Sequence, residues 1–333
     1  MKPNFLNNNM KIALVAPSFG CTTSPYNERL LKAIEIFNRL KINLLIGDNC
    51  FKNEGIAASN TPILRAKEFH EAWLSNCDAI ISVGGGETMI EILEHIDFEL
   101  IKNNPAKWFV GFSDNTNLTY TITTNCDIET IYGTNAPNFC RYPFTYDTLD
   151  TLLMLQGKKE FKGYGKWQLN EDKSNPFNDY NFDMKTNIIA KNYTKPFEGR
   201  LLGGCLDCLV SLCGTKYDKT AQYISNHSDE GIIFFLEACE LNSIGIRRAL
   251  FQLKNAGWFN NIKGFIVGRS LNYNDQSFGT TPIKAYIDLL ADLNVPILLD
   301  IDLGHLSPSI PIRCGGYAKI EYNDNNIFIT YKE

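Results

Sequence analysis

Long apolar runs are missing from this chain of 333 residues. No segment approaches the ~20 consecutive apolar residues that span a bilayer, and the first apolar run, Ile12 to Ala16, is too short for the core of a signal peptide. Blocks of lysine or arginine are missing too, and the formal net charge is -5. These absences argue against nucleic acid or a membrane as partner. We expect a cytoplasmic protein that binds a small molecule or a peptide.

Histidine is scarce, with four residues in the whole chain. His70 and His95 lie in predicted helices on solvated faces and His227 lies in a polar turn, so all three are expected to be ordinary surface residues. His305 differs because it follows a predicted strand, in a loop where glycine and proline fix the backbone. If the chain uses a histidine as a general base, His305 is the best placed.

Cysteine is not scarce, with ten residues, but most lie in apolar or helical contexts where a reduced thiol packs as a small core side chain. Examples are Cys77, Cys126, Cys213 and Cys239. The pair Cys205 and Cys208 has the C-x-x-C form of redox and zinc sites. A structural zinc needs four ligands, and no second C-x-x-C or H-x-x-H motif supplies the others. We therefore favour core packing for this pair over metal or redox use.

The first half of the chain alternates apolar strands with amphipathic helices, which predicts a parallel sheet covered on both faces. The predicted strands are Ile12–Pro17, Ile42–Gly47, Ala79–Val83 and Trp108–Phe112, and the predicted helices are Asn27–Leu40, Pro62–Asn76, Thr88–Ile96 and Asn115–Asn125. The fold class is therefore α/β, with an N-terminal, doubly wound, mostly parallel sheet.

The pattern loosens after Arg141, and Phe161 to Lys195 shows little periodicity. We predict an N-terminal α/β domain at 1–165 and a C-terminal domain of mixed strands and helices at 166–333, with 161–198 as a linker or active-site loop. In the second domain the predicted elements are a helix starting at Gly203-Gly204, strands Gly231–Leu236, Gly264–Val267 and Val295–Leu299, helices Ser243–Ala256 and Pro282–Leu293, and a hairpin over Ala318–Tyr331 that turns at Asn323-Asp324-Asn325.

The strand Trp108–Phe112 ends in the turn Gly111-Phe112-Ser113, and a helix-like segment follows. This arrangement presents a hydroxyl at the carboxyl end of a strand, where open α/β sheets carry out chemistry. Ser113 is therefore a candidate nucleophile. The alternative is that it only caps the following helix.

A serine nucleophile needs a base, and the base is normally a histidine oriented by a carboxylate. Glu237 ends a strongly apolar strand, where an ionised carboxylate is costly unless a cation pairs with it. We favour Glu237 as the partner of His305. Glu240, Asp300 and Asp302 remain alternatives.

Acyl transfer also needs donors for an oxyanion, and backbone amides in a glycine turn supply them. The turn Val83-Gly84-Gly85-Gly86 follows the third predicted strand. The amides of Gly85 and Gly86, with that of Asp114 after the serine, are the candidates. The same glycines could instead bind a phosphate.

Together these residues resemble the LD-carboxypeptidases and microcin C immunity proteins, a family of serine peptidases. The matching motifs run in the family's order over nearly the whole chain: Ala16-Pro17-Ser18, Gly84-Gly85-Gly86-Glu87-Thr88, Gly111-Phe112-Ser113-Asp114, Glu198-Gly199-Arg200-Leu201-Leu202-Gly203-Gly204, Leu236-Glu237 and Gly304-His305. The resemblance implies a triad in which Ser113 attacks, His305 is the base and Glu237 orients it. It also implies a site between two domains, usually a homodimer, and neither a metal nor an organic cofactor.

Within the family, the LD-carboxypeptidases that trim murein tetrapeptides typically carry Arg-Gly-Gly-Tyr-Gly at the glycine turn. This chain differs there and looks closer to the microcin immunity branch, in which a loop aromatic stacks on the nucleobase of a peptidyl-nucleotide. Trp167 is the candidate for that contact, with a partly exposed packing residue as the alternative, and Glu87 is the second candidate substrate-binding residue. Cys205 stands where relatives commonly have asparagine, so any contact made by that side chain is in doubt here.

The leading hypothesis is a serine carboxypeptidase-like hydrolase that cleaves a C-terminal amide of a short peptide or a microcin-type peptidyl-nucleotide. A murein tetrapeptide that loses its terminal D-alanine is the alternative substrate. Two other classes stay open. The glycine turn resembles the phosphate loop of some lipid and NAD kinases, and two α/β domains around a cleft also suit a non-catalytic binding protein.

Overall fold

The computed structural model describes residues 1–7, 10–172 and 174–332, and the chain forms two compact units. Unit 1 comprises Met1–Lys158, Glu171–Asp179 and Pro311–Arg313; unit 2 comprises Lys159–Asn170, Tyr180–Ile310 and Cys314–Glu333. The boundary at 165–166 stays a prediction, because each unit takes short pieces from the other half of the chain. Within the described ranges, no helix combines the length and apolar character that crossing a bilayer requires.

Unit 1 is built on a six-stranded sheet in the order β14-β5-β4-β3-β1-β2. The strands are β1 (Lys11–Val15), β2 (Asn43–Ile46), β3 (Ala79–Ser82), β4 (Trp108–Gly111), β5 (Thr130–Tyr132) and β14 (Ile312–Cys314). Strands β1 to β5 pair in parallel, and β1, β3 and β4 are almost fully buried. The near-continuous apolar runs in the sequence are therefore strands that are covered on both faces.

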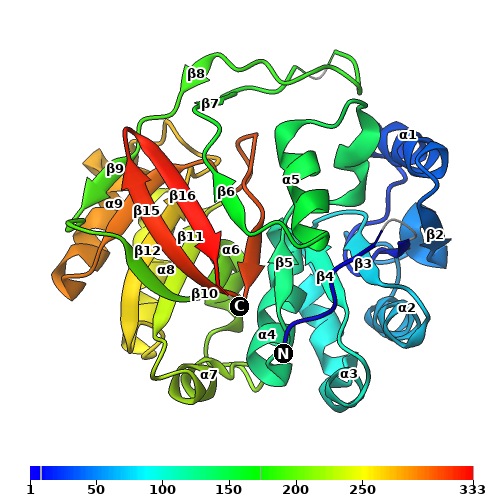
Figure 1. Ribbon diagram of the computed structural model, residues 1–333, viewed down its shortest axis with the longest axis horizontal. Helices are drawn as coiled ribbons and strands as arrows, with labels where there is room; N and C mark the ends of the chain where they lie inside the picture. The colour runs from blue at the N-terminus through cyan, green and yellow to red at the C-terminus, as the bar shows by residue number, and fades with distance from the viewer. Residues whose placement is uncertain (8–9, 173, 333) are drawn as a thin grey trace. The chain divides into compact units, whose positions relative to one another are not determined.

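Helices cover both faces of this sheet (Figure 1). Helices α1 (Tyr26–Arg39) and α5 (Tyr146–Leu155) lie on one side, and α2 (Pro62–Leu74), α3 (Phe98–Asn103) and α4 (Thr116–Cys126) lie on the other. The prediction of a doubly wound α/β domain is confirmed. The strand order reverses between β1 and β3, and in such sheets ligands bind outside the carboxyl ends of the strands at that point.

Unit 2 contains an eight-stranded mixed sheet in the order β6-β16-β15-β10-β11-β12-β13-β9. Strands β10 to β13 are parallel and the others pair antiparallel. The bounds are β6 (Glu160–Lys162), β9 (Ile189–Lys191), β10 (Phe197–Cys205), β11 (Ile232–Glu237), β12 (Ile262–Gly268), β13 (Ile297–Ile301), β15 (Tyr317–Asn323) and β16 (Asn326–Tyr331), with helices α6 (Leu206–Leu212), α7 (Thr220–Asn226), α8 (Ser243–Asn255) and α9 (Pro282–Leu290). The predicted C-terminal part of mixed strands and helices, including its last hairpin, is confirmed.

Three local predictions need correction. The segment predicted as a helix over Thr88–Ile96 forms a 3₁₀ helix, Met89–His95. The weakly periodic segment after Phe161 holds short strands, including β7 (Lys166–Trp167) and β8 (Met184–Lys185), which pair with each other. Strands this short leave no period in the sequence, because two residues cannot show an alternation.

The third correction concerns Gly203 and Gly204, which end strand β10 instead of starting a helix. Both have positive φ, and Gly203 pairs in register with Phe235 of β11. A Cβ on Gly203 would stand 1.8 Å from the Phe235 carbonyl oxygen. Glycine is needed at this position because the backbones of β10 and β11 approach closely. The local sequence, which resembles the start of a helix, does not reveal that contact.

Replacing Gly203 by alanine is therefore expected to destabilise the protein by at least about 4 kcal/mol, so that little folded protein is recovered. Gly214→Ala is the control, because Gly214 also has a positive φ, of 81°, but no atom lies within 4 Å of the place that an added methyl group would take. It should cost only about 1 kcal/mol. Thermal unfolding of both variants measures the difference, and equal losses would contradict the close approach.

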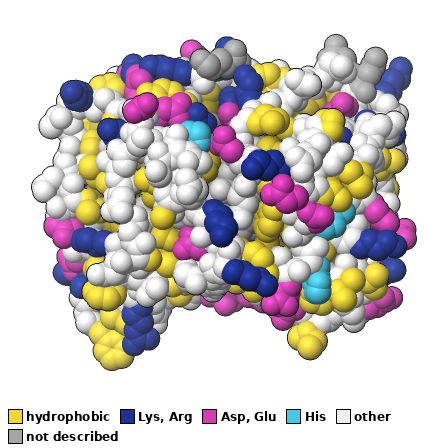
Figure 2. All heavy atoms as spheres, turned by 90° about the horizontal axis from the view of Figure 1, so that it is seen from below, with side chains coloured by type: hydrophobic (Ala, Val, Ile, Leu, Met, Phe, Trp, Pro, Cys, Tyr) yellow, Lys and Arg dark blue, Asp and Glu magenta, His cyan; other side chains and the backbone are white. Residues whose placement is uncertain are grey.

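Charged side chains of both signs are scattered over the face shown in Figure 2, with no large basic patch among the described residues visible there. This agrees with the net charge of -5 and with the absence of lysine and arginine blocks in the sequence.

Candidate active site

Ser113 lies two residues after the end of β4 and has a φ of 65°, a left-handed conformation that is unusual for any residue other than glycine. Its amide donates to Tyr132 Oη at 3.0 Å. A Cβ on Gly111, two residues before, would stand 2.6 Å from Asn115 Cγ, so only glycine fits there. Ser113 begins a 3₁₀ turn, Ser113–Asn115, and helix α4 follows with Asn115 at its N-cap position. This tight turn therefore holds the Ser113 hydroxyl on a strained backbone.

The glycine turn after β3 lies against this serine. A Cβ on Gly85 would stand 3.1 Å from Ser113 Cβ and 3.2 Å from Ser113 Oγ. Gly86 has a φ of 151°, and a Cβ there would stand 2.3 Å from Ser18 Oγ. The predicted oxyanion turn and the predicted nucleophile are thus brought together within unit 1.

The Asp114 side chain points into unit 1, where it is 4% exposed. It accepts hydrogen bonds from Ser18 Oγ at 2.5 Å, from the Met89 amide at 2.9 Å and from Asn117 Nδ2 at 2.9 Å. Burial raises the pKa of this carboxyl, against the effect of those donors. The side chain therefore ties the serine turn to the loops after β1 and β3.

Glu237 and His305 are also brought together, within unit 2. His305 Nδ1 lies 2.8 Å from Glu237 Oε2, and the Glu237 side chain is 0% exposed. Gly304 has a φ of 103°, and a Cβ on it would stand 2.7 Å from the same oxygen. The glycine before the histidine is therefore what allows the imidazole to reach the end of β11.

The protonation of His305 is governed by its surroundings. Burial disfavours the charged ring, but the negative charge of Glu237 and a hydrogen bond with the Cys239 side chain outweigh it and raise the pKa of His305 well above 6.5. An imidazole held this way by a carboxylate has one ring nitrogen fixed on Glu237 and the other, Nε2, turned away from it.

Two of the three alternative partners of His305, Asp300 and Asp302, are engaged elsewhere. Arg269 holds Asp300 at 3.0 Å and Asp302 at 2.7 Å, and all three side chains are buried. Asp302 also accepts from Thr186 Oγ1 at 3.0 Å, so this ion cluster fixes the segment after Phe161 to the end of β13. Burial raises the pKa of Asp300 to about 6.

Trp167 is 1% exposed, so it is a buried packing residue in this conformation. The Arg269 guanidinium lies 4.6 Å from the ring centre, and the Tyr273 ring lies 4.9 Å away in an edge-to-face contact. The indole nitrogen donates to the Lys185 carbonyl at 3.2 Å. Glu87, the other predicted substrate-binding residue, is exposed on the glycine turn of unit 1.

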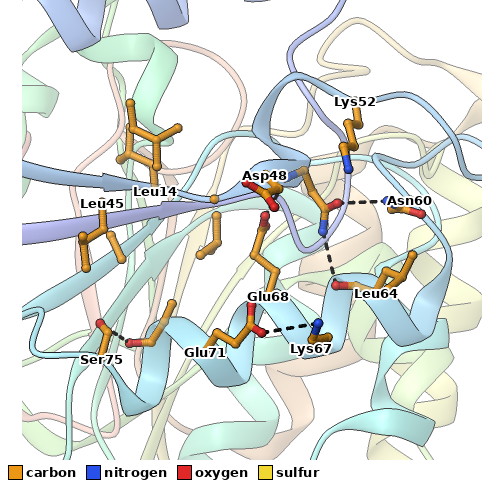
Figure 3. A pocket seen from close by; sticks show the side chains of 16 residues that line it. Leu14, Leu45, Asp48, Lys52, Asn60, Leu64, Lys67, Glu68, Glu71 and Ser75 are labelled. Atoms are coloured by element: carbon orange, nitrogen blue, oxygen red, sulfur yellow. Dashed lines mark hydrogen bonds and ion pairs between the residues drawn. The ribbon is translucent and has the colours of Figure 1, made fainter.

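A cavity of about 330 Å³ in unit 1 contains none of the predicted site residues (Figure 3). It lies between strands β1 and β2 and helix α2, and the Glu68 carboxylate reaches into it. Glu68 accepts from the Ala16 amide at 2.8 Å and from the Asn49 amide at 2.6 Å, while burial raises its pKa. Glu68 therefore anchors the chain two residues before Ser18.

Sequence reasoning missed Ser18, Tyr132 and Glu68 as supports of the serine turn. The motif Ala16-Pro17-Ser18 at the end of β1 was the available signal for Ser18, because it ends a strand next to β3. The sequence carries no signal for Tyr132 or Glu68, because their contacts with the Ser113 and Ala16 amides depend on which strands and helices are neighbours.

The chain is similar to known proteins over most of its length. Residues 12–133 match the LD-carboxypeptidase N-terminal domain, and residues 198–320 match the LD-carboxypeptidase C-terminal domain. The chain is 26% identical to the microcin C7 self-immunity protein MccF of Escherichia coli over 332 residues, which cover 96% of this chain and 92% of the relative. It is 24% identical to a probable murein peptide carboxypeptidase of Bacillus subtilis, over 95% of this chain and 90% of the relative.

The fold is shared with solved structures. A structure of MccF in complex with aspartyl sulfamoyl adenosine superposes with a TM-score of 0.84 at 22% identity, covering 100% of this chain and 99% of that one. The kinase-like alternative gains no support from these matches, which are to carboxypeptidases and immunity proteins. Both domain matches lie in the family's order, and together they span most of the chain. The chain therefore belongs to the LD-carboxypeptidase family and is a serine-type carboxypeptidase.

Proposed function

We propose that this enzyme hydrolyses the amide on the carboxyl side of an acyl group in a peptidyl-nucleotide or short peptide, through an acyl-enzyme on Ser113. The observation that carries the proposal is the strained conformation of Ser113 against Gly85 at the end of β4. Strain of this kind is retained where presentation of a side chain matters.

In the proposed reaction, Ser113 Oγ attacks the substrate carbonyl carbon while His305 Nε2 takes the hydroxyl proton. Glu237 holds the ring through Nδ1 and stabilises the imidazolium. The amides of Gly85, Gly86 and Asp114 donate hydrogen bonds to the developing oxyanion. His305 then gives its proton to the leaving nitrogen, and water releases the acyl group by the same steps. The proposal requires Ser113 of unit 1 to meet His305 of unit 2.

A peptidyl-nucleotide is the favoured substrate. The glycine turn Val83-Gly84-Gly85-Gly86-Glu87 differs from that of murein-trimming relatives, and the relative MccF has been solved with aspartyl sulfamoyl adenosine. Trp167 remains the candidate for stacking on the base, and its ring would have to leave Arg269 or Tyr273 to do so. We also propose that the enzyme is located in the cytoplasm and forms a homodimer.

A murein tetrapeptide is the second candidate substrate, because a relative of similar identity is a probable murein peptide carboxypeptidase. In that reaction the same residues would release a terminal D-alanine.

The two candidates are separated by offering both substrates to the same protein. We expect aspartyl sulfamoyl adenosine to be cut into aspartate and sulfamoyl adenosine, and a murein tetrapeptide to be left intact or cut at least about a hundredfold more slowly, a gap that a few lost contacts produce. Mass spectrometry of the products measures both rates, with Ser113→Ala as the blank. Preferred release of D-alanine would replace the nucleotide proposal with the murein one.

A further inference from the structure

The C-x-x-C pair is placed where it can form a disulfide. Cys205 is the last residue of β10 and Cys208 lies in the first turn of α6. The two side chains are hydrogen-bonded to each other, Cys205 being 1% exposed and Cys208 half-buried. Cys205 holds the N-cap position of α6 and Cys208 is the third residue of that helix, so the two side chains lie on the same side of its first turn. Among the described residues no cluster of three or more metal-ligating side chains occurs.

The residue between the two cysteines is connected to the candidate active site. The Asp207 carboxylate accepts hydrogen bonds from three consecutive amides, those of Cys239 at 3.0 Å, Glu240 at 2.9 Å and Leu241 at 3.0 Å. These amides form the loop that follows Glu237 at the end of β11. Asp207 also lies 3.4 Å from Cys205 Sγ. The C-x-x-C turn therefore shapes the loop behind Glu237.

Two further contacts bring the pair close to His305. Cys205 pairs in register with Glu237 on the neighbouring parallel strand. Cys239, at the start of the loop held by Asp207, has a side chain that contributes to raising the pKa of His305. The Cys205–Cys208 turn is thus connected, through Cys205 and the 239–241 loop, to both members of the His305–Glu237 pair.

We propose that Cys205 and Cys208 are a redox-active pair, and that a small-molecule disulfide converts them to an intramolecular disulfide that pulls Asp207 from the 239–241 loop and disables His305. All of these residues lie in unit 2. Formation of the disulfide does not depend on the proposed function; only its effect on hydrolysis does.

The reaction is thiol–disulfide exchange and it balances. The more accessible Cys208 thiolate attacks one sulfur of the small-molecule disulfide, which gives a mixed disulfide and releases one small thiol. Cys205 then attacks Cys208 Sγ and gives its proton to the departing thiolate, which closes the protein disulfide and releases the second small thiol. The protein loses two hydrogens and two electrons, and the small disulfide gains both.

The electrostatics assign the order of attack. The hydrogen bond with Cys208, burial and the Glu237 charge raise the pKa of the Cys205 thiol well above 9, so Cys205 keeps its proton and Cys208 is the sulfur that reacts first. Cys208 is also the less buried of the two.

The experiment treats the full-length protein with oxidised glutathione and follows the intact mass, the alkylation of each cysteine and the hydrolysis rate. We expect a loss of ~2 Da confined to Cys205 and Cys208, a fall in rate of about tenfold or more, and full recovery with dithiothreitol. Cys208→Ser should show neither change. Cys213→Ser, five residues further along the chain, should behave like the wild type.

A readout independent of turnover keeps this test separate from the proposed function. His305 is one of four histidines, so its ring signals can be assigned by comparison with His305→Asn and titrated by NMR before and after oxidation. A shift of the His305 titration on oxidation supports the coupling even if neither substrate is cut. Absence of the intramolecular disulfide, or a disulfide that leaves the His305 titration unchanged, would overturn the proposal.

Discussion

Replacing Ser113 by alanine is expected to lower kcat by about three to six orders of magnitude while the protein stays folded. In the proposed reaction the Ser113 hydroxyl forms the acyl-enzyme, and alanine has no group that can do so. Ser75→Ala, at the end of α2 in the same unit, is the control and should keep full activity. Steady-state rates with either candidate substrate, together with circular dichroism, measure the two properties.

Ser113→Gly sharpens this prediction, because it separates catalysis from stability. Glycine adopts a φ of 65° without strain, so this variant should be more stable than the wild type by about 1 kcal/mol and yet inactive. A residue that served only to support the fold would not combine lost activity with gained stability. If Ser113→Gly lowers the melting temperature and keeps turnover, the strain has another origin.

Replacing Glu237 by glutamine is expected to lower kcat/KM by about 10³–10⁴-fold, because an amide neither fixes the ring tautomer nor stabilises the imidazolium. Glu237 Oε2 lies 2.8 Å from His305 Nδ1 and the side chain is fully buried, so nothing from solvent can replace the carboxylate. Glu240→Gln is the matched control, because Glu240 is exposed and lies three residues away. A larger loss from Glu240→Gln would make that residue the orienting carboxylate.

The pH dependence of kcat/KM is a second test of the role of Glu237 beside His305. A base works when neutral, and the pKa of His305 is raised well above 6.5, so kcat/KM should increase with pH until that raised pKa is passed. Glu237→Gln removes the charge that raises the pKa while burial still lowers it, so the acid limb should move to lower pH. Stability has the opposite dependence: the charged pair stabilises fully below about pH 6.5 and its contribution is lost as pH rises through the folded pKa.

Much of unit 1 could be predicted from the sequence, because its strands are apolar runs and its candidate site residues come soon after the ends of those strands. Strands such as Ala79–Ser82 and Trp108–Gly111 are buried on both faces and therefore read as uninterrupted apolar runs. Parallel strands end at one edge, so residues that directly follow them, such as Gly85 and Ser113, could be expected to meet. Glu237 could be found in unit 2 by the same logic, as a carboxylate at the end of a buried strand.

What could not be predicted depends on contacts between segments far apart in the sequence. Gly203 is a glycine because of the Phe235 carbonyl, and Trp167 is buried because Arg269 and Tyr273 cover it. The three amides held by Asp207 lie more than thirty residues away from it along the chain. No local pattern encodes such a partner, because each residue alone is compatible with several surroundings.

The most direct test of the account is covalent labelling by a serine-reactive phosphonate, followed by peptide mass spectrometry. If Ser113 is the nucleophile, we expect one adduct per chain, on Ser113, with slower labelling in Glu237→Gln and none in Ser113→Ala. An adduct on another serine, or unchanged labelling in Ser113→Ala, would contradict it.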